Sequence, residues 1–90
     1  MSRYVLVTAD FPNVNSTDRE KIYKCLVEKK WNKIENVGRD ISTVWYASYK
    51  DGYNDDFILS DTKNEFVACS SPYTVAKIAI MIGPNPPIVA

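Results

Sequence analysis

The sequence contains no histidine and only two cysteines among its 90 residues. Without histidine, Ser-His and Cys-His nucleophiles are excluded, and two cysteines supply too few ligands for a zinc site. No apolar run reaches the about 18 residues of a membrane span, and no basic segment followed by an apolar stretch opens the chain. We therefore expect no membrane partner and a cytoplasmic location. Cys25 and Cys69 could pair, but reduced, buried thiols are favoured in that compartment.

The chain also lacks an excess of either charge, because eleven basic residues balance eleven acidic ones. Residues 1–50 carry a net charge of +3 and residues 51–90 a net charge of −3. A neutral chain lacks the broad basic surface that nonspecific nucleic-acid binding requires, although a local basic patch that includes Arg39 stays open. The length predicts a single domain, 1–90, whose small core makes a homodimer a natural way to gain stability.

Three stretches have the composition of β-strands. Residues 3–11 are nearly all apolar and rich in β-branched and aromatic side chains, which predicts a strand near the centre of a sheet, covered on both faces. Residues 31–37 and 41–50 are also predicted as strands. Asp51 and Gly52 then fit the tight turn of an extra hairpin, because glycine readily adopts positive φ.

The sequence patterns that predict helices are clear in one segment and ambiguous in two others. Residues 18–30 place their apolar side chains on one face, and Thr17 fits a capping box, so a helix is predicted there. Residues 57–59 and 65–69 fit either two short strands or parts of a helix, and we favour strands. Residues 73–82 are predicted as a helix, although their isoleucines would suit a strand equally well.

The predicted elements run in the order strand, helix, strand, strand, extra hairpin, helix and short strand. This order matches an α+β ferredoxin-like sandwich, with an antiparallel sheet, two helices on one face and an extra hairpin. Fold does not give function, which has to be argued from particular side chains.

Four stretches in the first half of the chain are similar to segments of known protein families. They are Tyr4-Val5-Leu6-Val7 with Asp10, a helix with Arg19, Lys21 and Leu26, residues 31–37, and Ser42-Thr43-Val44-Trp45. Together they resemble the small CRISPR-associated ferredoxin-fold nucleases and the endoribonuclease antitoxins of type V toxin systems. The resemblance implies that Asp10 pairs with its twin across a homodimer and binds Mg²⁺ for RNA cleavage. The alternative, which we favour, is that Asp10 caps the turn after its strand.

Acidic and aromatic side chains gather around the predicted hairpin. The acidic run lacks the glycine and glutamate that a calcium loop needs, so it is interpreted as a solvated loop or as a docking surface for a basic partner. The aromatic rings could anchor a protein interface, stack on RNA bases or pack in the core. The candidate binding residues are Trp45, Tyr49, Tyr53, Asp51, Asp55, Asp56 and Arg39.

Three functions follow from these patterns. We favour a noncatalytic regulator or inhibitor without a cofactor, which binds a protein partner such as a nucleic-acid-processing enzyme, because one strand-end carboxylate without histidine makes a poor active site. The second is a Mg²⁺-dependent endoribonuclease with Asp10 paired across a homodimer. The third is a single-stranded RNA-binding module that uses residues 41–53 and Arg39.

Overall fold

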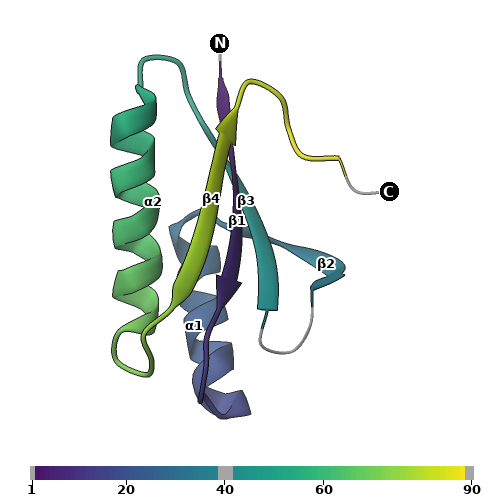
Figure 1. Ribbon diagram of the computed structural model, residues 1–90, viewed down its shortest axis with the longest axis vertical. Helices are drawn as coiled ribbons and strands as arrows, with labels where there is room; N and C mark the ends of the chain where they lie inside the picture. The colour runs from purple at the N-terminus through teal and green to yellow at the C-terminus, as the bar shows by residue number, and fades with distance from the viewer. Residues whose placement is uncertain (1, 39–41, 89–90) are drawn as a thin grey trace.

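The computed structural model describes residues 2–38 and 42–88, which form strands and helices in the alternation β-α-β-β-α-β (Figure 1). These elements are β1 (Arg3–Asp10), α1 (Ser16–Lys29), β2 (Asn32–Gly38), β3 (Ser42–Tyr49), α2 (Asp55–Ser70) and β4 (Lys77–Gly83). The strands pair antiparallel in the order β2-β3-β1-β4. The predicted antiparallel α+β sheet with two helices is confirmed, and the arrangement is compatible with a ferredoxin-like sandwich.

The first strand occupies the centre of the sheet, as predicted, because β1 pairs with β3 on one side and with β4 on the other. Val5, Val7 and Ala9 are buried, whereas Leu6 is half-buried and Thr8 is exposed. The prediction that both faces of this strand are covered is therefore wrong. The two helices pack on one face of the sheet, and no helix of the described residues covers the other, which we call the open face.

The core lies between the covered face of the sheet and the helices. Its buried side chains include Val7 of β1, Leu26 of α1, Trp45 of β3 and Phe66 of α2, together with Trp31, which precedes β2. The Phe66 ring contacts both indoles edge-on, with ring centroids 4.9 Å from Trp31 and 6.4 Å from Trp45. Large aromatic side chains thus join α2, β3 and the residue before β2 in one cluster.

Both helices begin at an asparagine. The Oδ1 atom of Asn15 accepts a hydrogen bond from the backbone N–H of Asp18 at 2.8 Å, and Asn54 accepts one from Phe57 at 2.8 Å. An asparagine side chain satisfies a helix N–H that has no partner within the helix. The prediction of Thr17 as the cap of the first helix is wrong, because Asn15 already performs this role and α1 starts before Thr17.

The prediction of two short strands at 57–59 and 65–69 is wrong, because α2 covers both ranges. The buried residues of α2 are Ile58, Thr62, Phe66, Cys69 and Ser70. Their spacing is helical, but the polar Thr62 interrupts the apolar pattern in its middle. Exposed Phe57 and Leu59 then flank a buried residue, which imitates the alternation of a strand.

The helix predicted at 73–82 is also wrong, because this segment contains β4. Ile78, Ile80 and Ile82 turn toward the helices and are half-buried, while Ala79 and Met81 lie on the open face. β-Branched side chains at every second position favour a strand, and pairing with β1 decides the outcome.

The extra hairpin after residue 50 does not form, so that part of the predicted fold is wrong. Gly52 has the predicted positive φ, +103°, but the turn that includes Asp51 leads from β3 into α2. The hairpin of this fold is instead β2 with β3. Its connection at residues 39–41 lies outside the described residues.

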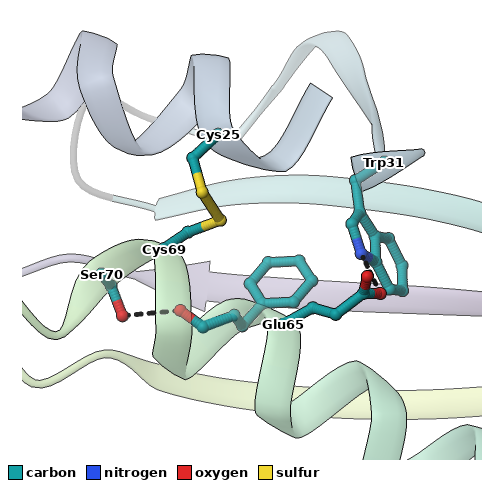
Figure 2. Close-up of a disulfide and its surroundings, with 6 residues drawn as sticks. Cys25, Trp31, Glu65, Cys69 and Ser70 are labelled. Carbon is teal, nitrogen blue, oxygen red and sulfur yellow. Dashed lines mark hydrogen bonds between the residues drawn. A yellow bond between two sulfur atoms is a disulfide. The ribbon is translucent and has the colours of Figure 1, made fainter. Parts of the chain in front are cut away.

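A disulfide joins Cys25 of α1 to Cys69 of α2, with the two Cα atoms 5.6 Å apart (Figure 2). The prediction of reduced thiols is wrong. The two cysteines are 44 positions apart in sequence, and only the packing of one helix against the other brings them together. Cys69 is buried, and next to it the hydroxyl of Ser70 donates a hydrogen bond to the carbonyl oxygen of Phe66 at 2.7 Å.

Candidate functional site

Three aromatic rings line up where β3 ends and α2 begins, and we call Tyr49, Tyr53 and Phe57 the aromatic end. The Tyr53 ring stacks on Phe57, with centroids 5.1 Å apart and planes at 17°. Tyr49 meets Tyr53 edge-on at 5.9 Å. Tyr53 and Phe57 are 49% and 48% exposed, whereas Tyr49 is 6% exposed. A stacked pair of exposed rings therefore rests on a third ring that is fixed in the core.

A hollow of about 310 Å³ lies beside these rings. Its lining residues are Lys30, Ser48, Tyr49, Lys50, Tyr53, Phe57 and Asp61. Tyr49, which lines the hollow, pairs with Arg3, so the hollow lies at the end of the sheet where β1 starts and β3 ends. Figure 1 shows these two strand ends beside the start of α2.

Below the aromatic end, Lys30, Tyr49, Asp61 and Glu65 form a hydrogen-bonded group, which we call the Lys30 cluster. The Lys30 ammonium donates to Asp61 at 3.0 Å and to Glu65 at 2.7 Å, and its Nζ atom lies 4.5 Å from the centre of the Tyr49 ring. The Tyr49 hydroxyl donates to Asp61 at 2.7 Å. The indole N–H of Trp31 donates to Glu65 at 3.2 Å, as Figure 2 shows. The cluster thus holds Tyr49 from both its ring face and its hydroxyl.

Burial and the hydrogen bonds within the Lys30 cluster shift the pKa values of its side chains. Partial burial on its own would lower the pKa of Lys30, but hydrogen bonds with Glu65, Tyr49 and Asp61 outweigh burial and raise the pKa. Burial would raise the pKa of Asp61, yet hydrogen bonds from Tyr49 and Lys30 hold it below its usual value. Burial and the hydrogen bond to Asp61 raise the pKa of Tyr49. Near neutral pH the cluster consequently contains the Lys30 cation, an ionised Asp61 and a neutral Tyr49 phenol.

Lys30 also has an unusual backbone conformation, with φ at +137°. It is the C-cap residue that directly follows α1, and the backbone N–H groups of Lys30 and Trp31 both donate to the carbonyl oxygen of Leu26, at 3.2 and 3.0 Å. Glycine is the usual residue at such a helix end, because a side chain is strained at positive φ. The contacts of the Lys30 side chain offset this strain.

Acidic residues border the aromatic end. Asp55 accepts two hydrogen bonds from the Arg3 guanidinium, at 3.0 and 2.8 Å, so the ion pair ties α2 to the start of β1. Asp56 occupies the same first turn of α2, and Asp51 lies exposed in the preceding turn. Carboxylates in the first turn are favoured by the helix dipole, which gives them a structural role beside any role in binding.

The predicted binding residues divide into two groups. The structure brings Tyr49, Tyr53, Asp55 and Asp56 to one end of the molecule, with Asp51 in the adjoining turn. Trp45 is fully buried in the core, and its indole N–H donates to the Thr43 hydroxyl at 2.7 Å, so its prediction as a binding residue is wrong. Arg39 lies outside the described residues.

The candidate catalytic residue, Asp10, lies at the opposite end of β1 from the aromatic end. It is half-buried and lies opposite Lys77 in the sheet, beside a hollow of about 250 Å³ lined by Thr8, Lys77, Ile78 and Ala79. Within residues 2–38 and 42–88, no three acidic or cysteine side chains come together as a metal site would require. The pairing of Asp10 with its twin across a homodimer stays a prediction.

The sequence-based prediction missed four residues of this region: Phe57, Lys30, Asp61 and Glu65. Phe57 follows Tyr53 by four positions, a spacing that aligns two rings only once the segment is known to enter a helix. Lys30 and Glu65 are 35 positions apart, and no local pattern connects them. A helical reading of 55–70 would have placed Asp61 and Glu65 on one face, which was the available signal.

No protein-family model and no curated protein matches the chain. Within the described residues, neither helix is long and apolar enough to cross a bilayer.

Proposed function

We propose that this chain is a small noncatalytic binding protein on a ferredoxin-like scaffold, which docks on a protein partner that carries basic side chains. The strand order β2-β3-β1-β4 and the β-α-β-β-α-β alternation support the scaffold. The observation that carries the proposal is the exposed stacked pair Tyr53 and Phe57, held from below by Tyr49.

Rigid aromatic rings are the side chains that most often dominate protein interfaces, because they bury a large area at a low cost in conformational entropy. Tyr53 and Phe57 already contact each other in the free chain, and Tyr49 is fixed by the Lys30 cluster. Binding would therefore require little further ordering of this surface.

The chemistry of the surroundings favours a basic partner. Asp51 and Asp56 border the aromatic end, and an arginine of a partner could stack on an aromatic face while it pairs with a carboxylate. The same carboxylates would repel the phosphates of RNA. This charge distribution is why we rank the protein partner above the RNA-binding alternative.

The disulfide bears on where the protein acts. Disulfides are rare in cytosolic proteins, where the glutathione and thioredoxin systems keep thiols reduced. We infer an oxidising compartment from the bond between Cys25 and Cys69, in place of the cytoplasmic location expected from the sequence.

Affinity capture from the native cell, compared across variants, tests the function. We expect the wild-type chain to retain a protein partner, and Tyr53→Ala with Phe57→Ala to reduce its capture by about tenfold or more. Val67→Ala is a matched control, because Val67 lies on the same helix and is 46% exposed. Treatment with ribonuclease should leave the capture unchanged.

Two experimental outcomes would contradict this proposal. Equal capture by the wild-type chain and by the Tyr53 and Phe57 double variant would show that the aromatic end is not the docking surface. Mg²⁺-dependent RNA cleavage by the purified chain, abolished by Asp10→Asn while the folding is intact, would support the endoribonuclease instead.

A further inference from the structure

β4 forms one edge of the sheet, and the described chain places no strand on its outer side. Ile78, Ile80 and Ile82 face the helices but are only half-buried, unlike the fully buried Val5 and Val7 on β1. On the open face, Met81 is 69% exposed in the single chain. This edge thus leaves both apolar side chains and backbone hydrogen-bonding groups accessible.

The two edges of the sheet differ in how they are protected. Edge strands usually carry charges, prolines or bulges that prevent pairing with another chain. β2 carries Lys33, and its register with β3 shifts between Lys33 and Gly38. β4 pairs with β1 in an unbroken register, and its only charge is its first residue, Lys77. Of these two strands, β4 is the one suited to pairing.

We propose that β4 pairs antiparallel with β4 of a second copy, about a two-fold axis that passes by Ile80. This register aligns all seven residues of the strand and keeps the helices of both copies on the same side of one continuous sheet. The cross-strand pairs are Ile80 with Ile80, Lys77 with Gly83, Ile78 with Ile82, and Ala79 with Met81.

The sequence of β4 is complementary to itself in this register. Lys77 lies opposite Gly83, so like charges do not meet. The isoleucines face one another on the side of the helices, where pairs of β-branched residues stabilise a sheet. On the open face, the large Met81 side chain of one copy would lie beside the small Ala79 side chain of the other. A second copy of this chain is therefore the partner that fits the edge.

This dimer separates the two copies of Asp10. Asp10 lies on β1, one strand in from the β4 edge, and its register partner on β4 is Lys77. The two carboxylates would be three strand spacings, about 14 Å, apart across the sheet and six residues, about 20 Å, apart along it, or about 25 Å in all. They could not bind one metal ion together. The proposal does not depend on the aromatic end, which β4 does not contribute to.

Size-exclusion chromatography with light scattering at several concentrations tests the dimer. We expect the wild-type chain to reach twice its monomer mass at high micromolar concentration. Ala79→Lys with Met81→Lys places like charges opposite each other in both cross-strand pairs, and should weaken the dimer by about tenfold or more. Ala79→Glu with Met81→Lys places opposite charges there and should restore it.

Val27→Lys is the control for added charge, because Val27 is 58% exposed on α1, away from β4, and this variant should remain dimeric. Amide hydrogen exchange of the wild-type chain provides a second measurement that needs no substitution. Amides of β4 should become more protected as the concentration rises. A wild-type monomer at every concentration, a dimer that the two lysines leave unchanged, or protection of β4 that is independent of concentration would overturn the proposal.

Discussion

Lys30 is a lysine at a backbone position where glycine is usual, and its side chain explains why it is tolerated. Its φ of +137° costs on the order of 1–3 kcal/mol for a residue with a side chain. Its ammonium lies between Asp61 and Glu65 and above the Tyr49 ring. Charge-assisted hydrogen bonds in a partly buried site are strong enough to offset strain of that size.

Substitution of Lys30 measures this balance. Lys30→Met should lower the free energy of unfolding by about 2 kcal/mol, because two partly buried carboxylates lose their cation while the strain persists. Lys30→Gly should cost less, since glycine relieves the positive φ. Lys29→Met, at an exposed neighbouring position, should stay within about 0.5 kcal/mol of the wild type. Urea unfolding at neutral pH gives all four values, and equal losses for Lys29 and Lys30 would contradict this account.

The pH dependence of stability follows from the same residues. The pKa of Asp61 is lower in the folded state, so its contribution is present above the ordinary value of about 3.9 and is lost as the pH falls through the folded pKa. The pKa values of Lys30 and Tyr49 are raised, so their contribution is present below about pH 10 and is lost as the pH rises further.

Urea unfolding across pH should therefore show a plateau near neutral pH with losses at both ends. Asp61→Asn should flatten the acid limb, because an amide does not titrate. Asp56→Asn is the matched control, as Asp56 is exposed and lies outside the Lys30 cluster. An acid limb that Asp61→Asn leaves unchanged would show that other carboxylates control acid unfolding.

At the scale of elements, the disulfide cross-links the two helices that cover the sheet. It closes a separation of 44 residues, for which the loss of chain entropy in the unfolded state predicts about 4 kcal/mol of stabilisation. The strands are joined by backbone hydrogen bonds, whereas without the disulfide the helices would be held to the sheet by side-chain contacts. The bond therefore fixes α1 against α2, and α2 carries Phe57 of the aromatic end.

Reduction of the wild-type chain tests this role. The free energy of unfolding in urea should fall by about 2–4 kcal/mol when a reductant is added, and Cys25→Ser with Cys69→Ser should match the reduced wild type. Protein isolated from its native cell should react with a thiol reagent only after reduction. Free thiols in that sample would contradict both the bond and the inferred oxidising compartment.

Among the elements, β1, α1, β2 and β3 were predicted close to their observed bounds, and in β1, α1 and β3 the apolar pattern agrees with the local structure. α2 and β4 were not. Thr62 lies on the buried face of α2 and interrupts its helical pattern. In β4, Ile78, Ile80 and Ile82 fit two periodicities in a short window, and the contacts with β1 select the strand.

At the scale of the molecule, the aromatic end and the β4 edge occupy different parts of the fold. The first is built from the end of β3 and the start of α2, and the second from the strand at the border of the sheet. A dimer through β4 would present two copies of the aromatic end, and paired weak sites bind a repetitive partner more tightly than one. The tests of the two proposals use separate residues, so that one can fail without the other.

The sequence by itself determined the α+β class, the central first strand and the exclusion of histidine chemistry, because these depend on composition and on local periodicity. It also placed Tyr49, Tyr53 and the acidic residues near one another, since they are close along the chain. Only the tertiary structure decided that Trp45 is buried, that Cys25 meets Cys69 and that Lys30 lies between Asp61 and Glu65. Each of these depends on contacts between segments far apart in sequence, and no local pattern records which segments the packing of helices on a sheet will bring together.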